Sequence, residues 1–348
     1  QLQISSYRRK YTVSFSDLDK ELIDNLTKDS FLIIDSNVNN LYPQIKKSFD
    51  KKKVFIIAAT EKNKSLSCCQ KLINGLVERG IKKNHRLVSV GGGIVQDITG
   101  FVASVLYRGI EWVFLPTTLL AQADSCIGSK TSINLGDIKN LIGTFYPPSE
   151  IYCCAEFIET LSEKDIKSGI GEILHFYLIS GSPYVNELMD SYESIFKNSG
   201  EISKHIYESL KIKQRMIMKD EFDQNERRVF NYGHTFGHAI ETISNYEIPH
   251  GQAVTLGMDI ANYVALKLGV LDQGAFTRMH EMLKKNMPEF KIKKEQLDLY
   301  MDALMKDKKN VDKSIVCILP HSFGDMRVKK IDDKQILRNI IEEYEKSC

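Results

Sequence analysis

The first 150 residues alternate short β-rich segments with segments of helical periodicity, and this alternation constrains the fold more than any other feature. Strands that alternate with helices in this way pair in parallel in α/β folds. One helical segment, SLSCCQKLINGLVERG, ends at Gly80, a residue typical of a helix C-terminus. Four apolar runs have the composition of buried strands: 31–35, 54–58, 86–90 and 112–116. This region therefore predicts a parallel α/β domain.

The pattern changes after Tyr146-Pro147-Pro148. From about residue 155 to the end of the sequence, helical periodicity dominates. No internal repeat and no low-complexity linker interrupts the chain. The sequence therefore predicts two domains, an α/β domain over 1–150 and a mainly α-helical domain over 151–348.

The composition excludes some classes of protein. The 348 residues carry 47 Lys and Arg against 45 Asp and Glu, a net charge of +2, so no global charge favours nucleic acid. No apolar run approaches the ~20 residues that span a bilayer. The seven cysteines form no CxxC motif, and the first residues lack the apolar core of a signal peptide. We expect a cytoplasmic protein with reduced thiols that binds neither nucleic acid nor membranes.

A glycine turn follows one of the predicted strands. The run 86–90 leads into Gly91, Gly92 and Gly93 and then into an apolar helical pattern. Glycines between a strand and a helix N-terminus let an anion approach backbone N–H groups. The motif is not GxGxxG, because Gln96 stands in the third glycine position, and a plain tight turn explains the glycines equally well. Asp35, at the end of an earlier strand, suits either a ribose hydroxyl or the cap of the next helix.

Histidines and one carboxylate recur in the second half of the chain. The stretch NYGHTFGHAIE places His234 and His238 one helical turn apart. Glu172 and His175 share an apolar helical segment, and His250 stands in an HG pair. Two histidines with one carboxylate are a common catalytic zinc set, although any one histidine could simply satisfy a local hydrogen bond. Residue chemistry alone does not choose three ligands among these five.

Positive charges accompany these segments. The cations are Arg108, Lys130, Lys139, Lys213 and Arg227. In a chain of nearly neutral net charge, cations near a metal and a nucleotide motif favour a small polyanionic substrate such as a sugar phosphate.

Several long motifs in a fixed order resemble those of the 3-dehydroquinate synthases, within the sugar phosphate cyclase superfamily. The motifs are GGGIVQDITGFVASVLYRGIEWVFLPTTLLAQADSCIGSKTSINLGDIKNLIGTFYPP, GEIL, NYGHTFGHAIE and HGQAVTLGM, and the resemblance extends from Asp35 to the lysines at 308 and 309. It implies an N-terminal Rossmann-like α/β domain, a mainly α-helical C-terminal domain, NAD, one zinc or cobalt ion, and a homodimer. The implied reaction is a lyase reaction that converts 3-deoxy-D-arabino-heptulosonate 7-phosphate to 3-dehydroquinate and releases phosphate, with no net redox change.

The resemblance also implies roles for individual residues. The implied metal ligands are Glu172, His234 and His250, whereas His238 meets the substrate phosphate. The implied cofactor residues are Asp35, Glu61, Lys64, Gly91, Gly92, Gly93, Asp97, Thr117, Thr118, Asp124, Lys139, Phe157 and Thr160. The implied substrate residues are Lys130, Asn140, His175, Lys213, Arg227, Asn231, His238, Lys308 or Lys309, and Arg108, which reaches across the dimer interface.

The sequence departs from the family pattern at three positions. His175 replaces a lysine that contacts substrate, Ser129 replaces a glycine, and Gln252 replaces a glutamate. Lys213, Arg227 and Asn231 still favour a carboxylated substrate. The alternatives are a related cyclase acting on sedoheptulose 7-phosphate or glucose 6-phosphate, a metal-dependent polyol dehydrogenase, and a binding protein without activity.

Overall fold

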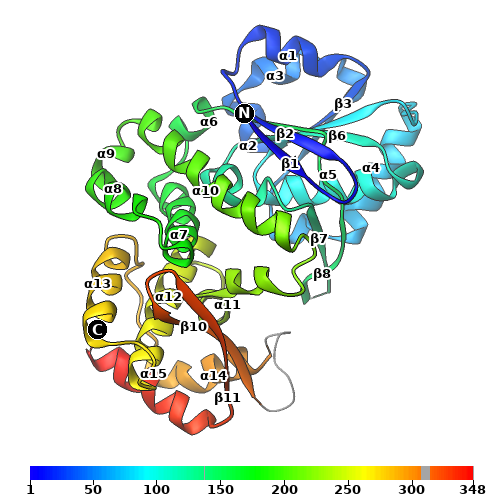
Figure 1. Ribbon diagram of the computed structural model, residues 1–348. Helices are drawn as coiled ribbons and strands as arrows, with labels where there is room; N and C mark the ends of the chain where they lie inside the picture. Colours follow the sequence, from blue (N-terminus) through cyan, green and yellow to red (C-terminus); the bar gives the residue numbers. More distant parts are fainter. Residues whose placement is uncertain (137, 307–313, 348) are drawn as a thin grey trace. The chain divides into compact units, whose positions relative to one another are not determined.

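The computed structural model describes residues 1–136, 138–306 and 314–347 (Figure 1). It divides into two compact units. The first contains Gln1–Ser162 and Asn198–Phe222, and the second contains Glu163–Lys197 and Asp223–Cys348. The first unit thus includes a segment from the second half of the sequence, which no change of composition marks.

A seven-stranded sheet forms the first unit, in the order β1-β2-β9-β6-β5-β3-β4. The strands from β2 to β4 in this order pair in parallel, and β1 joins β2 in antiparallel fashion. The strands are β1 (Leu2–Ser5), β2 (Lys10–Phe15), β3 (Ser30–Asp35), β4 (Val54–Ile57), β5 (Arg86–Gly91), β6 (Glu111–Pro116) and β9 (Glu150–Cys153). The predicted parallel α/β architecture is confirmed. The four predicted strands are neighbours in the sheet, and β4 lies at its edge.

The core of this unit lies on the central strands. Leu32 of β3, Val88 of β5 and Val113 of β6 share one row of the sheet and are fully buried. All six residues of β3 are buried, as in parallel sheets covered on both faces. An apolar run without alternation is therefore the correct sequence signal for these strands.

Helices and a short hairpin complete the first unit. Helix α5 contacts β5, β6 and the hairpin strand β7, and α10 contacts the π-helical segment η4. The hairpin consists of β7 (Lys130–Leu135) and β8 (Ile138–Phe145). The helical segments are α1 (Lys20–Thr27), α2 (Ser36–Leu41), α3 (Pro43–Ser48), η1 (Lys51–Lys53), η2 (Glu61–Asn63), α4 (Leu66–Glu78), α5 (Gly93–Val105), η3 (Leu106–Arg108), η4 (Ala121–Ser125), α6 (Glu156–Glu159) and α10 (Ser199–Lys219).

The second unit is mainly helical, as predicted, and packs around α12 (His250–Lys267), which is buried from Gly251 to Ala265. Helix α12 contacts α7, α11, α13, α15 and β10. The other elements are α7 (Glu163–Ser180), α8 (Tyr184–Asp190), α9 (Tyr192–Ile195), η5 (Glu226–Asn231), α11 (His234–Ile243), α13 (Gln273–Lys284), η6 (Lys294–Gln296), α14 (Leu297–Met305), β10 (Ile315–Ser322), β11 (Asp325–Ile331) and α15 (Lys334–Ser347). The antiparallel pair β10–β11 is an addition that the sequence pattern does not predict.

Within the described residues, no helix has the length and apolar character needed to cross a membrane.

Candidate metal and nucleotide sites

Glycines allow α7 and α12 to touch through their backbones. A Cβ atom on Gly251 would lie 1.8 Å from the carbonyl oxygen of Ser168, and one on Gly171 would lie 2.0 Å from the carbonyl oxygen of Gly251. Neither position has room for a larger residue. Because Glu172 and His250 are the sequence neighbours of these glycines, the crossing brings a carboxylate and an imidazole together.

A second close approach sets the start of α11. Gly233 precedes the helix at φ +76°, a left-handed conformation that glycine adopts without a steric penalty. A Cβ atom on Gly257 of α12 would lie 2.2 Å from the carbonyl oxygen of Gly233. The first residue of α11, His234, is therefore held against α12.

These three helices bring Glu172, His234 and His250 together. Oε1 of Glu172 lies 3.2 Å from Nε2 of His250 and 3.6 Å from Nε2 of His234. Glu172 is only 2% exposed, and among the described residues no group donates a well-formed hydrogen bond to its Oε1 atom. A divalent ion with tetrahedral ligands at ~2.0–2.2 Å separates neighbouring ligand atoms by about 3.3–3.6 Å. The donor set and its spacing fit one such ion.

The other ring nitrogen of each histidine meets an acceptor. Nδ1 of His234 lies 3.2 Å from the carbonyl oxygen of Tyr232, and Nδ1 of His250 lies 3.3 Å from Oε2 of Glu241. An acceptor at Nδ1 favours the tautomer in which Nε2 carries a lone pair for a metal. Burial lowers the pKa of His250, but the nearby carboxylates of Glu241 and Glu172 outweigh this and raise it well above its usual value.

His238 lies on the next turn of α11 and is exposed. Its ring centroid is 5.5 Å from that of His234 and 5.7 Å from that of His250. His238, Glu241 and His250 form a second group whose ligand atoms lie within 4.8 Å of one another. Helical spacing presents His234 and His238 as equivalent, whereas the structure places only His234 against the buried Glu172 carboxylate.

His175 is buried, with 1% of its surface exposed. Its Nδ1 atom lies 3.6 Å from Oε2 of Glu172, and its ring centroid is 4.8 Å from that of His234. The rings of Phe176, Phe230 and Tyr232 also pack around it, with centroids at 5.2, 6.1 and 6.3 Å. The imidazole therefore lies beside Glu172 and His234, two members of the cluster of Glu172, His234 and His250, which we call the metal-type cluster. The rest of its environment is aromatic.

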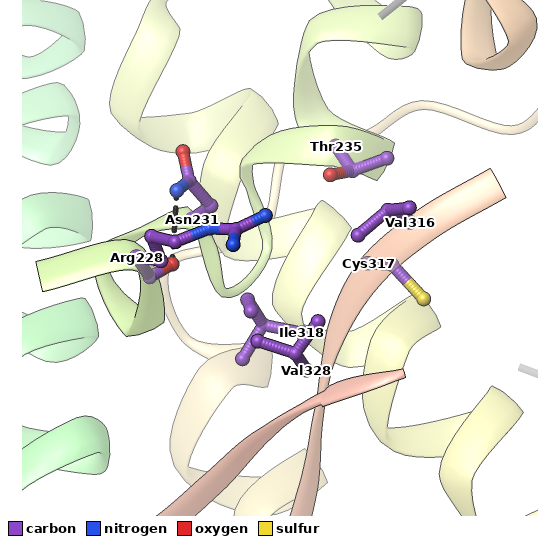
Figure 2. A pocket seen from close by; sticks show the side chains of 7 residues that line it. All are labelled: Arg228, Asn231, Thr235, Val316, Cys317, Ile318 and Val328. Atoms are coloured by element: carbon purple, nitrogen blue, oxygen red, sulfur yellow. Dashed lines mark hydrogen bonds between the residues drawn. The ribbon is translucent and has the colours of Figure 1, made fainter. Parts of the chain in front are cut away.

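A small pocket in the second unit is lined by residues from η5, α11 and the β10–β11 pair (Figure 2). Asn231 donates a hydrogen bond from Nδ2 to the carbonyl oxygen of Arg228 at 2.9 Å, and the apolar wall includes Val316 and Val328. The neighbouring Arg227 is 4% exposed. The predicted substrate residues Lys308 and Lys309 lie outside the described residues.

The glycine turn of the first unit joins β5 to α5. A Cβ atom on Gly92 would lie 2.9 Å from the Thr118 side chain, and one on Gly91 would lie 2.8 Å or less from the Val95 side chain. The Thr117 N–H donates to the carbonyl oxygen of Gly91 at 3.0 Å. The turn thus packs directly on the segment that follows β6, and the predicted residues 91–93, 117 and 118 are neighbours at the carboxyl ends of adjacent parallel strands.

Asp35 ends β3 and precedes α2, so it occupies the cap position, yet its side chain makes no capping hydrogen bond. Its Oδ1 atom accepts the N–H of Ala59, which follows β4, at 3.2 Å. The carboxylate is therefore at the sheet edge where a dinucleotide ribose binds in related folds, and the capping interpretation is wrong for its side chain.

Four polar residues of the first unit, Lys64, Asp97, Ser132 and Asn140, form a connected set that we call the Lys64 cluster. Nζ of Lys64 lies 2.6 Å from Oδ2 of Asp97 and donates to Oδ1 of Asn140 at 2.6 Å. The Ser132 N–H donates to Asp97 at 2.9 Å. Burial raises the pKa of Asp97, the Lys64 ammonium and the Ser132 donors lower it, and the net shift is upward.

The remaining predicted residues of this unit occupy several places. Nζ of Lys213 lies 2.8 Å from Oδ1 of Asp124 and donates to its carbonyl oxygen at 2.7 Å. Nζ of Lys139 lies 4.0 Å from Oε1 of Glu61. Phe157 and Thr160 both contact Tyr42. The ring centroids of Phe157 and Tyr42 lie 5.0 Å apart, and the hydroxyl oxygens of Thr160 and Tyr42 lie 3.1 Å apart. Lys130 begins β7 and is exposed, as is Arg108, whose φ is +61°.

Sequence reasoning missed Glu241, Ser132 and the Tyr232 carbonyl. The sequence could have indicated Glu241, because this residue follows His238 by three positions and so lies near it on one helix face. No sequence feature indicates the backbone carbonyl of Tyr232 or the hydroxyl of Ser132, because tertiary contacts determine their partners.

The fold and these clusters define a nucleotide-binding type of α/β unit joined in one chain to a helical unit with a metal-type cluster. The comparisons with known proteins agree. The 3-dehydroquinate synthase N-terminal family matches residues 54–168, and the 3-dehydroquinate synthase C-terminal family matches residues 169–310. The 3-dehydroquinate synthase of Dictyoglomus turgidum is 37% identical over 327 residues, covering 92% of this chain and 90% of the relative. The chain belongs to the 3-dehydroquinate synthase family.

Solved structures of related cyclases share the fold. A 2-deoxy-scyllo-inosose synthase complexed with carbaglucose-6-phosphate, NAD+ and Co2+ matches with a TM-score of 0.84 at 23% identity, covering 98% of this chain and 99% of that one. The 2-epi-5-epi-valiolone synthase ValA from Streptomyces hygroscopicus, with NAD+ and Zn2+ bound, matches with a TM-score of 0.84 at 22% identity, covering 99% and 100%. The expected fold, an α/β unit with a helical unit of the dehydroquinate synthase type, is confirmed.

Proposed function

We propose that this protein is an NAD- and metal-dependent sugar phosphate cyclase that converts 3-deoxy-D-arabino-heptulosonate 7-phosphate to 3-dehydroquinate and releases phosphate. The observation that carries the proposal is the buried Oε1 atom of Glu172, which faces Nε2 of His234 and Nε2 of His250 without a well-formed hydrogen bond. Family membership and relatives named 3-dehydroquinate synthase support the reaction. Such a reaction is a carbon–oxygen lyase reaction.

In this proposal, Glu172, His234 and His250 hold one zinc or cobalt ion. Residues at the carboxyl ends of β3, β5 and β6 hold NAD: Asp35, the turn 91–93, Thr117 and Thr118, with the other cofactor residues of the family pattern. When bound, these groups supply a transient oxidation of a ring hydroxyl and polarisation of its oxygen. The related cyclases whose structures contain NAD+ with Co2+ or Zn2+ support this pair of cofactors.

The chain's own contribution is charge placement and orientation. Lys130, Asn140 and His238 are proposed to bind the substrate phosphate, and Lys213 and Arg227 its carboxylate. Asn231 is proposed as a further substrate residue. Lys213 is already oriented by two contacts with Asp124, so little side-chain freedom is lost on binding. Arg108 is exposed, and we propose that it serves the partner subunit of a homodimer in the cytoplasm.

The residue at position 175 favours a related cyclase activity as the second candidate function. His175 occupies a position where the family pattern has a substrate-contacting lysine, and the imidazole is 1% exposed among aromatic rings. Histidine is also shorter than lysine, so it does not reproduce the contact that the family lysine makes with the substrate. A sugar phosphate with a different charge distribution, such as sedoheptulose 7-phosphate or glucose 6-phosphate, is therefore the alternative.

Two histidine variants test the division of roles within α11. In His234→Ala we expect loss of the bound metal and of turnover, because an Nε2 ligand to the ion is removed. In His238→Ala we expect the metal to remain at one equivalent while turnover falls by about 100-fold or more, as for loss of a group that acts in the transition state. Metal content by mass spectrometry and phosphate release measure the two effects.

The comparison is informative because the two side chains share one helix and one kind of substitution. Equal metal loss in both variants would mean that His238 is a ligand. Full metal content in His234→Ala would remove the proposed site altogether.

A further inference from the structure

The Lys64 cluster lies within the first unit, and Lys64 and Asp97 are among the cofactor residues that the resemblance implies. A cofactor role does not explain why Lys64 and Ser132 both contact the Asn140 side chain. We propose that Lys64 and Ser132 position the Asn140 side chain as a hydrogen-bond donor for the phosphate group of the ligand. Lys64 is then a positioning residue that acts through Asn140. The inference rests on the proposed function, because that function supplies the phosphate.

Lys64 is oriented toward the protein. The residue is 7% exposed, and its Nζ atom has two close partners, Oδ2 of Asp97 and Oδ1 of Asn140, both at 2.6 Å. An ammonium group with so little exposure needs a counter-ion and hydrogen-bond acceptors. Asp97 provides the charge, and the second acceptor is the Asn140 amide oxygen.

Asn140 receives two donors at one atom. Its Oδ1 atom accepts from Nζ of Lys64 at 2.6 Å and from Oγ of Ser132 at 2.9 Å. The opposite amide orientation would place the Asn140 NH₂ group against an ammonium group, which has no acceptor. The contacts therefore fix which way the amide faces, and Nδ2 is the end that remains for a ligand.

The backbone of Asn140 is held as well. Its φ is +52°, a left-handed conformation, and its N–H donates to Oδ1 of Asn134 at 2.9 Å. Nδ2 of Asn134 donates in turn to Oε1 of Glu61 at 2.8 Å. The residue is exposed in spite of these contacts.

The amide oxygen of Asn140 has two donors, and its NH₂ group has no hydrogen-bond acceptor among the described residues. Such an exposed amide discriminates between ligands. It presents hydrogen-bond donors only, which suits the oxygen atoms of a phosphate. The cluster also places a positive charge behind the amide, and this charge polarises the amide in the direction that strengthens its N–H donors. Loss of Lys64 would let the amide rotate and present its oxygen. An amide oxygen cannot donate a hydrogen bond to a phosphate.

A double-mutant cycle on the full-length protein tests this role. The variants are Lys64→Met, Asn140→Ala and the combination of both, each saturated with NAD and zinc. The affinity for inorganic phosphate is measured by calorimetry. We expect each single variant to weaken phosphate binding by about tenfold, the effect of one lost hydrogen bond to a charged group. The double variant should be no weaker than Asn140→Ala alone, because Lys64 acts through the amide.

Three further variants sharpen the test. Lys62→Met removes an exposed lysine two positions away and should leave phosphate affinity unchanged, which controls for net charge. Ser132→Ala removes the second donor to Oδ1 and should cost about threefold. Asn140→Asp should bind phosphate more weakly than Asn140→Ala, because a carboxylate repels the anion. Thermal unfolding of each variant checks that the fold is intact.

Strictly additive effects in the double variant, or wild-type phosphate affinity in Lys64→Met, would overturn the positioning role while leaving the proposed function in place. A wild-type protein that binds no phosphate under these conditions would refute both.

Discussion

At the scale of single residues, the charge on Glu241 decides how firmly His250 is held. Its Oε2 atom lies 3.3 Å from Nδ1 of His250, and its negative charge contributes most to raising the pKa of that imidazole. Removal of an outer partner of a metal-binding histidine commonly weakens metal affinity by about 10–100-fold. We expect a loss of this size for zinc in Glu241→Gln, measured by competition with a chelator.

A matched control exists nearby. Glu247 is exposed and follows α11, and Glu247→Gln makes the same change of charge on the same unit. It should leave zinc affinity within about twofold of wild type, as for a screened surface charge. A similar loss in both variants would show that net charge, and not the contact with His250, sets the affinity.

The choice of metal ligands marks the limit of what residue chemistry predicts at this scale. Five residues of suitable type were available, and spacing on a helix made His234 and His238 equivalent. The difference between them arises from α7 and α12, which place Glu172 and His250 beside His234. Family resemblance selects Glu172, His234 and His250, and these three lie together, but no periodicity argument could have found this.

At the scale of elements, the crossing of α7 and α12 depends on glycine. A Cβ atom on Gly251 would lie 1.8 Å from the Ser168 carbonyl oxygen, so Gly251→Ala must push the helices apart. We expect a loss of about 3 kcal/mol in the free energy of unfolding, the upper range for overpacking, together with weaker zinc binding. Denaturant unfolding and zinc titration measure the two effects.

The same substitution elsewhere in the second unit provides the comparison. Gly274 lies in α13, where the nearest atom to an added Cβ is the end of the Asp272 side chain at 3.2 Å. Gly274→Ala should change stability by no more than about 1 kcal/mol, since alanine is the better helix former. Equal stability of Gly251→Ala and wild type would contradict the close packing that we describe.

Three helices of the second unit also share one buried carboxylate. Asp259 of α12 is fully buried and lies 2.9 Å from Nδ1 of His280 in α13, and the Tyr344 hydroxyl of α15 donates to it at 2.6 Å. The hydrogen bond to Asp259 raises the pKa of His280 above its usual value, while burial opposes that shift. The folded state therefore favours the protonated imidazole.

The sign of the pH dependence follows from this shift. A raised pKa in the folded state stabilises fully below the unfolded value, near 6.5, and the contribution disappears as the pH rises through the folded value. We expect the difference in urea midpoint between wild type and His280→Gln to be largest near pH 6 and to shrink toward about pH 8–9. A difference that stays constant over this range would exclude the charged pair.

Elements differed in how far the sequence predicts them. Strands β3, β5 and β6 are buried on both faces along almost their whole length, so their apolar runs are unambiguous. Strand β8 has no fully buried residue and therefore carries no apolar period that could reveal the β7–β8 hairpin. The sequence also does not predict that α10 belongs to the first unit, because helical periodicity does not specify the element that a helix packs against.

At the scale of the whole molecule, the proposed reaction uses NAD as a catalyst and does not consume it. A dehydrogenase of similar layout would produce one NADH for each substrate converted, whereas a cyclase returns the hydride and releases phosphate. The composition and net charge of the chain do not distinguish these outcomes. The clusters in the two units do not distinguish them either, because both classes bind a dinucleotide and a metal.

The most direct measurement follows phosphate and NADH together during complete conversion. Purified protein with NAD and zinc or cobalt is given 3-deoxy-D-arabino-heptulosonate 7-phosphate, with glucose 6-phosphate and sedoheptulose 7-phosphate in parallel. We expect one phosphate released for each heptulosonate phosphate consumed, with no net NADH. Phosphate released only from one of the other two sugars would contradict the substrate, and stoichiometric NADH without phosphate release would contradict the cyclase function itself.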